Sequence, residues 1–471
     1  MTDTHFAVLD EKRLSPFHFR AMLTTGLGVF CDGYDISSIS LVLGPALHAY
    51  GIQKMTNVEA GALTASALVG SILGALVFGL LAQKGRKRFY GVDALILGLG
   101  AVAQAFMPTL AALIACRFVL GIGVGADYVL SPTIMAEHAN RADRGKAIGL
   151  GFGTMWPVGA LGAALLKLLL DSFHVPPDLV WKLVLAGGAI PALGVIYLRR
   201  TMPETARYLA RVAADEAEAS RVMQQIGGTP AAAPSADTRP FWDVFKLHAK
   251  HIFAAALLWM VYDLVVYAGV LFGPNLIAQS LGMSPAIYQI LTEAVFVIPA
   301  SVLMSWFLLD NWGRKPTQVW GFAASAVVLV VFALLNLAKG VSALLRFLVF
   351  QLFNITQTGP GLVSGAGIYG VELAPTRIRS VAQSITVVGG RIGASISAFA
   401  FPQMVGSLGP LTAKFLGVAP AVANLNTLGL VASMFILAVI AVLGAVLSHV
   451  LVPETSSRSL EEINLEHAAV G

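Results

Sequence analysis

Carboxylate side chains inside apolar segments are the first residues of this sequence that could do chemistry. Asp32 and Asp35 stand in the apolar run 19–48, three residues apart, so on a helix they share roughly one face. A charge at membrane depth costs at least about 2.5 to 3.5 kcal/mol and is expected to face a cavity or a partner. A buried carboxyl group can also bind and release a proton near neutral pH. We predict proton coupling by at least one of the two, the alternative being a plain structural contact.

A second feature is a stripe of Trp259, Asp263 and Tyr267 in a segment that is otherwise rich in Leu, Val and Ala. The positions i, i+4 and i+8 lie on one face of a helix. An isolated Trp or Tyr is more often a core residue or an interfacial anchor, but this does not explain the aspartate between them. We predict that the stripe lines a central cavity.

Two further charged residues lie well inside apolar segments. Arg391 stands in the run GGRIGA, whose glycines leave room for a long side chain. The fixed fork of donors on an arginine suits anion recognition; the alternative is a salt bridge to Asp263 or Asp32. Both are compatible, since the arginine can exchange partners when an anion arrives. Glu293, in the middle of another apolar segment, is a further candidate for proton coupling.

The elements that must position these residues are membrane-spanning helices. The 471 residues are 56% hydrophobic and 12% charged, with a mean hydropathy of +0.76, whereas ordinary soluble domains carry about 25% charged residues. A spanning helix needs roughly 20 mostly apolar residues. Such segments occur at 19–48, 58–82, 89–107, 109–137, 145–170, 179–198, 251–279, 285–309, 317–337, 341–370, 381–405 and 425–451. We predict an all-α membrane protein with twelve transmembrane helices in two six-helix bundles.

The distribution of Lys and Arg sets the orientation, because basic residues collect in every second loop. The positive-inside rule then places both termini and the central linker in the cytoplasm. We predict an N-terminal bundle at 1–198, a cytoplasmic linker at 199–250, a C-terminal bundle at 251–452 and a cytoplasmic tail at 453–471. The protein is expected to be a multi-pass protein of the cell membrane.

Several other classes of protein are disfavoured. The net charge of +5 is carried in short loops, which argues for membrane topology and against a nucleic-acid partner. Cys31 and Cys116 lie in apolar segments without metal-ligand spacing, so no metal site is predicted. The nine histidines do not form a set with a nucleophile, so no enzyme is predicted.

Three short motifs occur in both halves of the chain in the same order. They are Gly-Arg-Lys at 85–87 and 313–315, Glu137 with Arg144 and Glu372 with Arg379 at equal spacing, and Pro-Glu-Thr at 203–205 and 453–455. A repeat of this kind implies two bundles that face each other across a central site.

Charged residues near the helix ends of both repeats are predicted to form a cytoplasmic gate that holds the halves together in one state. The alternative is ordinary charging of helix ends, worth roughly 0.3 to 1 kcal/mol each. The gate residues are Arg86, Arg117, Glu137, Arg144, Asp310, Arg314, Arg346, Glu372 and Arg379.

The basic loops, the arginines Arg117 and Arg346 that open the fourth and tenth spans, and the Pro-Glu-Thr ends together resemble the major facilitator superfamily over essentially the whole chain. One departure concerns the first loop, where that superfamily usually has an acidic residue just before Gly-Arg-Lys. This chain has Ala82 and Gln83 there, whereas the second half keeps Asp310. We therefore expect an asymmetric gate.

Within that superfamily the stretch GADYVLSPTIMAE, which begins at Gly125, resembles the signature GGDYPLSATIMSE of the phosphate:proton symporters. The Trp-Asp-Tyr stripe, the run CDGYD and the run GGRIGA, with Arg391 in the position of that family's lysine, are similar too. The resemblance implies that Tyr128 and the stripe surround a bound anion, and that the first-span aspartates and Asp127 handle the proton.

Two positions differ from the phosphate symporters. Their substrate-binding glutamine in the fifth span aligns with Met155, and their asparagine in the tenth span aligns with Val363 or a near neighbour. Both changes remove a hydrogen-bonding side chain, while Arg391 adds a guanidinium that binds small oxyanions and carboxylates in bidentate fashion.

The sequence therefore predicts a proton-coupled symporter of a small anionic solute, with inorganic phosphate or a similar oxyanion as the leading substrate. Its partners would be that anion, protons and the lipid bilayer, with no cofactor besides the coupling proton, and we expect a monomer. An organic acid or a sugar is the alternative substrate, because the run CDGYD also resembles those branches of the superfamily. A membrane nutrient sensor is the alternative of another class.

Overall fold

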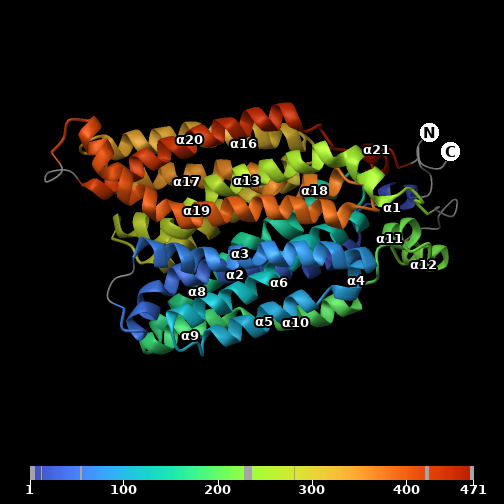
Figure 1. Cartoon of the computed structure of the whole chain (residues 1–471), viewed down its shortest axis with the longest axis horizontal. Coiled ribbons are helices and arrows are strands. Elements are labelled where there is room, and N and C mark those ends of the chain that lie inside the picture. Colours follow the sequence, from blue (N-terminus) through green and yellow to red (C-terminus); the bar gives the residue numbers. More distant parts are fainter. Residues whose placement is uncertain are drawn as a thin grey trace.

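A computed structural model describes residues 6–11, 13–52, 56–226, 236–280, 282–419 and 424–466. Parts of the predicted linker (227–235) and of the predicted tail (467–471), together with residues 1–5, lie outside the described residues. The described part of the chain folds into helices that run side by side along the long axis of the molecule, without strands (Figure 1).

The first half of the chain forms one bundle, in the lower part of Figure 1. Its main helices are α2 (Pro16–Ala49), α3 (Asn57–Leu81), α5 (Val92–Gln104), α6 (Leu110–His138), α8 (Met155–Ser172), α9 (Pro177–Gly187) and α10 (Ala189–Thr201). Local signals explain several starts. Thr56 caps α3 by accepting a hydrogen bond from the Glu59 amide at 3.2 Å, and Glu59 accepts one from the Thr56 amide at 2.8 Å.

The second half forms the other bundle. Its main helices are α13 (Phe241–Ser280), α14 (Pro285–Leu291), α15 (Ile298–Leu303), α16 (Arg314–Leu337), α17 (Ala343–Pro360), α18 (Ile368–Glu372), α19 (Arg379–Phe415) and α20 (Leu425–Leu451). Short π-helical segments interrupt the spans that face the other half: η2 (Gly149–Gly153), η3 (Thr292–Val297), η4 (Met304–Leu308) and η5 (Gly361–Gly365). Such segments are frequent at functional sites of membrane and soluble helices.

Ten helices of the described residues are long and apolar enough to cross a membrane. The remaining two predicted spans hold shorter helices, the 13-residue α5 and the 18-residue α17, which continues through η5 into α18. These two helices complete the two groups of six. The predicted fold class is confirmed.

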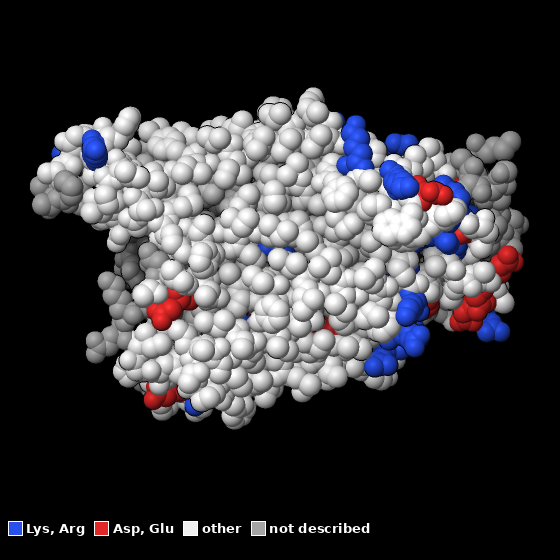
Figure 2. Space-filling view, viewed as in Figure 1, with Lys and Arg blue, Asp and Glu red and all other residues white. Residues whose placement is uncertain are grey.

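A small cap covers the end of the molecule where both termini lie, at the right of Figure 1. It consists of α1 (Ala7–Glu11), α11 (Ala206–Arg211), α12 (Glu216–Ile226) and α21 (Leu460–Asn464). Leu9 packs with Val222, Met223 and Ile226 in a core of its own. We call this group the terminal cap, and this end of the molecule the cap end. Lys and Arg gather there on the visible surface (Figure 2).

The two bundles are joined by close contact of α3 with α19. Ser384 Oγ donates to the Ala75 carbonyl at 2.7 Å, and Ser380 Oγ donates to the Gly79 carbonyl at 3.1 Å. A Cβ on Gly79 would stand 2.3 Å from that of Ser384. Small residues thus allow the two backbones to approach, as is usual between membrane helices.

Candidate functional site

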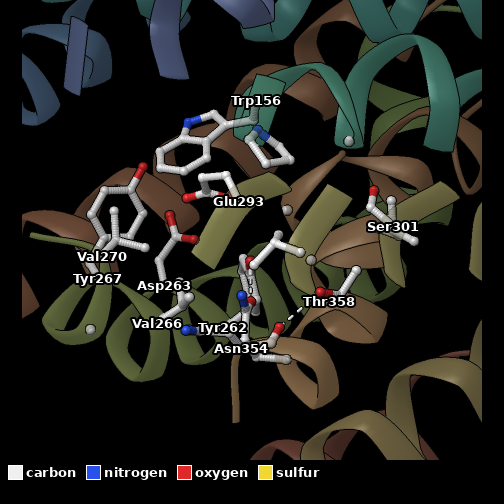
Figure 3. Close-up of a pocket in the computed structure, with 18 of the residues that line it drawn as sticks. Trp156, Tyr262, Asp263, Val266, Tyr267, Val270, Glu293, Ser301, Asn354 and Thr358 are labelled. Carbon is white, nitrogen blue, oxygen red and sulfur yellow. Dashed lines mark hydrogen bonds between the residues drawn. The ribbon is translucent and has the colours of Figure 1, made fainter. Parts of the chain in front are cut away.

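A cavity of about 110 Å³ lies between the two bundles. Helices of both halves line it, and Figure 3 shows part of its wall. Most of the side chains singled out from the sequence for ligand binding meet here, together with Glu293. They are Tyr128, Trp259, Asp263, Tyr267, Glu293 and Arg391.

Arg391 is the buried cation of this cavity, with 1% of its surface exposed. Its Nη1 donates a hydrogen bond to Tyr267 Oη at 2.6 Å, and its guanidinium carbon lies 3.9 Å from the ring centroid of Tyr128. Its Nη2 lies 3.8 Å from Asp32 Oδ2. The ring of Tyr128, the hydroxyl of Tyr267 and the carboxylate of Asp32 therefore surround the guanidinium, and both predicted roles, anion ligand and salt-bridge partner, are geometrically open to it.

The glycines around Arg391 allow two helices to pack closely, whereas they were predicted to leave room for the arginine side chain. A Cβ on Gly393 would stand 2.2 Å from the Met260 carbonyl oxygen, and one on Gly390 would stand 2.4 Å from the Trp259 ring. Helix α19 can therefore lie directly on α13, which carries the Trp-Asp-Tyr stripe. This contact brings Arg391 to the same cavity as Asp263 and Tyr267.

Two of the acidic side chains at the cavity have oxygens without a well-formed hydrogen bond. Asp263 Oδ2 is buried without a hydrogen-bond partner in the described structure, and the oxygens of Asp32 accept no hydrogen bond of good geometry there, although Arg391, Tyr128 and Trp156 interact with this carboxylate. A buried polar group left unpaired costs about 1 to 3 kcal/mol. These oxygens are therefore the natural places for a proton or a ligand to bind.

Glu293 lies in the π-helical segment η3 and is 5% exposed. Gln289 Nε2 donates to its Oε1 at 2.6 Å, while its Oε2 has no partner among the described residues. Figure 3 shows Glu293 and Asp263 reaching into the cavity from the ribbons that carry them. Glu293 is thus a third acidic group at the site.

The other two predicted proton-coupling residues lie elsewhere. Asp35 accepts a hydrogen bond from Gln104 Nε2 at 2.9 Å and lies 3.5 Å from Arg117 Nη1. Asp127 accepts from Ser131 Oγ at 2.7 Å and from Arg199 Nη2 at 2.5 Å. Neither aspartate lines the cavity, and their roles in proton coupling stay predictions.

Asp93 and Arg199 complete the buried group around Asp127. Arg199 Nη1 donates to an Asp93 carboxylate oxygen, and the guanidinium lies 4.4 Å from the ring centroid of Tyr90. These two residues were not predicted to be functional. The sequence does offer a signal for each of them, because a charged residue stands near the start of one apolar segment, Asp93, and at the end of another, Arg199.

Met155 does not line the cavity, although a substrate-binding position was predicted for it. Its side chain faces Gly26 of α2, where a Cβ would stand 2.7 Å from it. The next residue, Trp156, faces the cavity instead. Val363 is likewise buried away from the cavity, whereas Leu362 lines it. In both regions a residue next to the one aligned by sequence lines the cavity.

Several polar side chains of the cavity wall were missed. They are Tyr262, Gln289, Asn354, Gln357 and Thr358. The last three fall at i, i+3 and i+4 of an apolar segment, so they share one face of a helix. That spacing was the signal that could have found them.

The gate motifs of the two repeats form reciprocal ion pairs at the cap end. Glu137 of the first half binds Arg86 of its own half at 3.2 Å and Arg379 of the other half at 3.0 Å. Glu372 of the second half binds Arg314 of its own half at 3.2 Å and Arg144 of the other half at 2.7 Å.. Each glutamate therefore joins the two bundles, and this end of the molecule is closed.

The gate is asymmetric, as the departure in the first loop predicted. Asp310 accepts hydrogen bonds from the amides of Gly145 and Lys146 at 3.0 and 2.7 Å. In the first half Ala82 takes the corresponding place, and the neighbouring Gln83 Nε2 donates to Ser380 Oγ at 2.7 Å. One half thus contributes a charged contact and the other a neutral one.

Arg117 and Arg346 do not belong to this gate, which corrects the prediction. Each lies within two turns of the start of its helix, and Glu137 and Glu372 mark the other ends of these two spans. Arg117 Nη1 donates to Gln104 Oε1 at 2.9 Å, at the end of α5 that lies away from Arg86. These helix starts therefore lie on the side of the bundle opposite to the one predicted.

Two six-helix bundles that enclose a buried polar cavity and are locked together at one end define a transporter of the major facilitator superfamily. The model of the sugar (and other) transporter family matches residues 21–466. The chain belongs to that family.

Curated relatives cover nearly the whole chain. It is 31% identical to the probable inorganic phosphate transporter 1-10 of Oryza sativa subsp. japonica, over 98% of this chain and 92% of the relative. It is also 31% identical to the low affinity inorganic phosphate transporter 4 of Lotus japonicus, over 97% of this chain and 93% of the relative.

Among solved structures, a proton:xylose symporter superposes with a TM-score of 0.78 at 21% identity, over 96% of this chain and 99% of that chain. An inward-open form of the xylose transporter from E. coli superposes with a TM-score of 0.65 at 22% identity, over 95% of this chain and 99% of that chain. At this identity the likeness concerns the fold.

Proposed function

We propose that this protein is a proton-coupled symporter of a small anion, with inorganic phosphate as the leading substrate. The observation that carries the proposal is Arg391, a buried guanidinium that faces the cavity between Tyr128 and Tyr267. Arginine binds the oxygens of phosphate and carboxylate groups through paired donors. The relatives named as inorganic phosphate transporters support phosphate as the first anion to test.

Proton coupling is supported by the balance of charges around the cavity. Three carboxyl groups, those of Asp32, Asp263 and Glu293, stand at or beside it with the guanidinium of Arg391. An anion that enters this site with all three carboxylates ionised would add to a negative charge in a buried region, which is strongly unfavourable. Protons on these carboxyl groups remove that repulsion, so anion and protons bind together.

Transport is proposed to proceed by alternating access, with the cap end in the cytoplasm. The ion pairs of Glu137 and Glu372 close this end, and they must break for the cavity to open there. The concentration of Lys and Arg at the cap end supports its cytoplasmic location. A protease added to right-side-out cells should then leave a tag on either terminus intact.

The test is uptake of radiolabelled phosphate into proteoliposomes that contain the purified protein, with and without an inward proton gradient. We expect the gradient to stimulate uptake in the wild type and the stimulation to fall at least about tenfold in Asp32→Asn and Asp263→Asn. Asp178→Asn, the same chemical change at an exposed position, is the control. Phosphate that neither enters nor competes, while an organic acid does, would assign the alternative substrate.

A further inference from the structure

One wall of the cavity contributes Glu293 to the proposed proton coupling, but none of its residues has been assigned to the binding of the anion itself. It is formed by α14, η3 and α17 of the second bundle, and it carries Gln289, Glu293, Asn354, Gln357 and Thr358. Figure 3 shows Asn354 and Thr358 away from Tyr267. Thr358 Oγ1 donates a hydrogen bond to the Asn354 carbonyl at 2.9 Å. We call these five residues the amide wall.

The internal contacts of the amide wall leave hydrogen-bonding capacity unused. Gln289 Nε2 donates to Glu293 Oε1 at 2.6 Å, and Tyr262 Oη donates to Gln357 Oε1 at 2.9 Å. Asn354 Nδ2 donates to Gln351 Oε1 at 3.0 Å. Glu293 Oε2 is more than nine-tenths buried and remains without a partner among the described residues. This oxygen faces the cavity as an acceptor for a donor that the protein does not supply.

The chemistry of this wall differs from that of an oxyanion site. A carboxylate oxygen cannot donate, and it repels a phosphate oxygen that approaches it. Primary amides both donate and accept, as hydroxyl groups do. A ligand hydroxyl group can donate to Glu293 Oε2 when this carboxyl is ionised, or accept from it when it carries a proton, while the same hydroxyl exchanges a hydrogen bond with an amide of the wall.

The size and the remaining lining of the cavity favour a ligand larger than a single tetrahedral anion. About 10 to 15 Å³ is enough for one water, and the cavity measures about 110 Å³. Trp156, Tyr262 and Val266 also line it and offer apolar faces to a carbon skeleton.

We propose that the amide wall is a subsite for hydroxyl groups, so that the cavity takes a hydroxylated organic anion such as the phosphate ester of a short polyol. Arg391 binds the anionic group, and Gln289, Glu293 and Asn354 bind the hydroxyl groups. This inference rests on the proposed function for the anionic group. It names a substrate class other than the inorganic phosphate of the relatives' names.

The test is equilibrium binding to the full-length protein in detergent, by isothermal titration calorimetry. The probes are glycerol 3-phosphate and methyl phosphate, two esters that share the phosphate group and differ in the hydroxyl groups. We expect the wild type to bind glycerol 3-phosphate at least about tenfold more tightly. The pair glycerate and propionate makes the same comparison for a carboxylate.

Variants locate the preference in the amide wall. Gln289→Met and Asn354→Leu remove hydrogen-bonding groups at similar size, and each should bring the ratio of the two dissociation constants close to one. Asn336→Ala is the control, because this asparagine bonds only within its own helix, to the Phe332 carbonyl at 2.8 Å, among the contacts described. It should keep the ratio of the wild type.

The outcomes separate this inference from the proposed function. Equal binding of the two members in both pairs, no binding of any of them, or a preference that survives both variants would overturn the subsite. A preference for the hydroxylated ester that disappears in the variants, in a protein that shows no proton-driven phosphate uptake, would support the subsite and reject phosphate symport.

Discussion

In the proposed function, Arg391 is the residue on which ligand binding should depend most. Its guanidinium is held by Tyr267 at 2.6 Å and by the ring of Tyr128, so it meets a ligand in a fixed orientation. A lysine keeps the charge and loses the planar fork. Replacing Arg391 by lysine therefore tests the planar shape of the side chain separately from its charge.

We predict that Arg391→Leu abolishes phosphate binding and that Arg391→Lys weakens it about tenfold, because one of two parallel hydrogen bonds to a charged group is lost. Calorimetric titration of both variants measures this. Equal affinity of the lysine variant and the wild type would show that the fork is not used. Lys182→Arg, at an exposed position, serves as the control.

Glu293 is expected to contribute to the pH dependence of uptake. If it carries a proton with the substrate, Glu293→Gln should keep binding at low pH and lose the pH dependence of uptake that the wild type shows between about pH 5 and 8. Uptake measured across this range in proteoliposomes, beside Asp178→Asn, decides it. A pH profile that is unchanged from that of the wild type would remove Glu293 from proton coupling.

The site was partly predictable from sequence, and the reason for each failure is physical. The Trp259, Asp263 and Tyr267 stripe was found because helical spacing alone puts three residues on one face. The role of Asp127 in proton handling stays a prediction, but its ion pair with Arg199 was not predicted, because sequence spacing does not say which side chains of different helices meet. Its partner Arg199 is 72 residues away in the chain.

At the scale of elements, glycines set how closely the helices pack. A Cβ on Gly125 of α6 would stand 1.9 Å from the Ser71 carbonyl oxygen of α3, which is backbone and cannot rotate away. A Cβ on Gly194 of α10 would have no atom of the described residues within 4 Å, apart from its own helix backbone and chain neighbours. The two positions form a matched pair for testing helix contact.

We predict that Gly125→Ala destabilises the protein by roughly 1 to 3 kcal/mol, as overpacking does, and lowers the melting temperature. Gly194→Ala should be neutral or slightly stabilising, since alanine restricts the unfolded chain and fits a helix. Thermal unfolding in detergent measures both. Equal melting temperatures of the two variants would contradict the prediction.

The terminal cap holds together by a buried ion triad. Arg207 donates to Asp10 at 2.8 Å and to Glu461 at 2.7 Å, so it joins the segment before the first bundle to the segment after the second. Burial raises the pKa of the Asp10 carboxyl from 3.8 to about 6, against the opposite effect of Arg207. Burial also opposes ionisation of Glu461, but Arg207 outweighs it and keeps the pKa of Glu461 below its usual range.

The raised pKa of Asp10 makes docking of the terminal cap depend on pH. The docked cap binds a proton at Asp10 more tightly than the undocked chain does, so docking gains stability as the pH falls through about 6 and loses it as the pH rises. We predict about tenfold higher protection of the α1 amides from hydrogen exchange at pH 5 than at pH 7, after correction for intrinsic rates. The dependence should vanish in Asp10→Asn, and protection that rises with pH would contradict it.

At the scale of the whole molecule, the repeat in the sequence corresponds to a repeat of contacts. The spacing of Glu137 with Arg144 and of Glu372 with Arg379 predicted a gate, and the structure joins each glutamate to the arginine of the other half. The twelve spans and the two bundles were predictable because apolar length and internal repetition are visible in one dimension. The direction of each span decides on which side of the bundle Arg117 and Arg346 lie. The prediction for these two residues was wrong because it did not take that direction into account.

We predict that Glu137→Gln and Glu372→Gln each loosen the closed end to a similar extent, because the two ion pairs are related by the repeat. Spin labels on cysteines at the exposed positions Arg88 and Asn311, in a background without Cys31 and Cys116, report the distance between the bundles. Either variant should broaden the distance distribution toward longer values, while Asp178→Asn leaves it unchanged. A change in only one glutamate variant would contradict the equivalence.

The placement of the cation at the centre has a consequence for energetics. Tyr128 and Asp32 belong to the first bundle, whereas Arg391 belongs to the second, and they meet at 3.9 and 3.8 Å. Any solute that takes over the guanidinium also replaces a bond between the two moving bodies. The free energy of ligand binding is therefore linked to the free energy that holds the two bundles together at the centre. A compound that binds tightly to one bundle alone would occupy the site without replacing this bond between the bundles, and we expect it to inhibit transport.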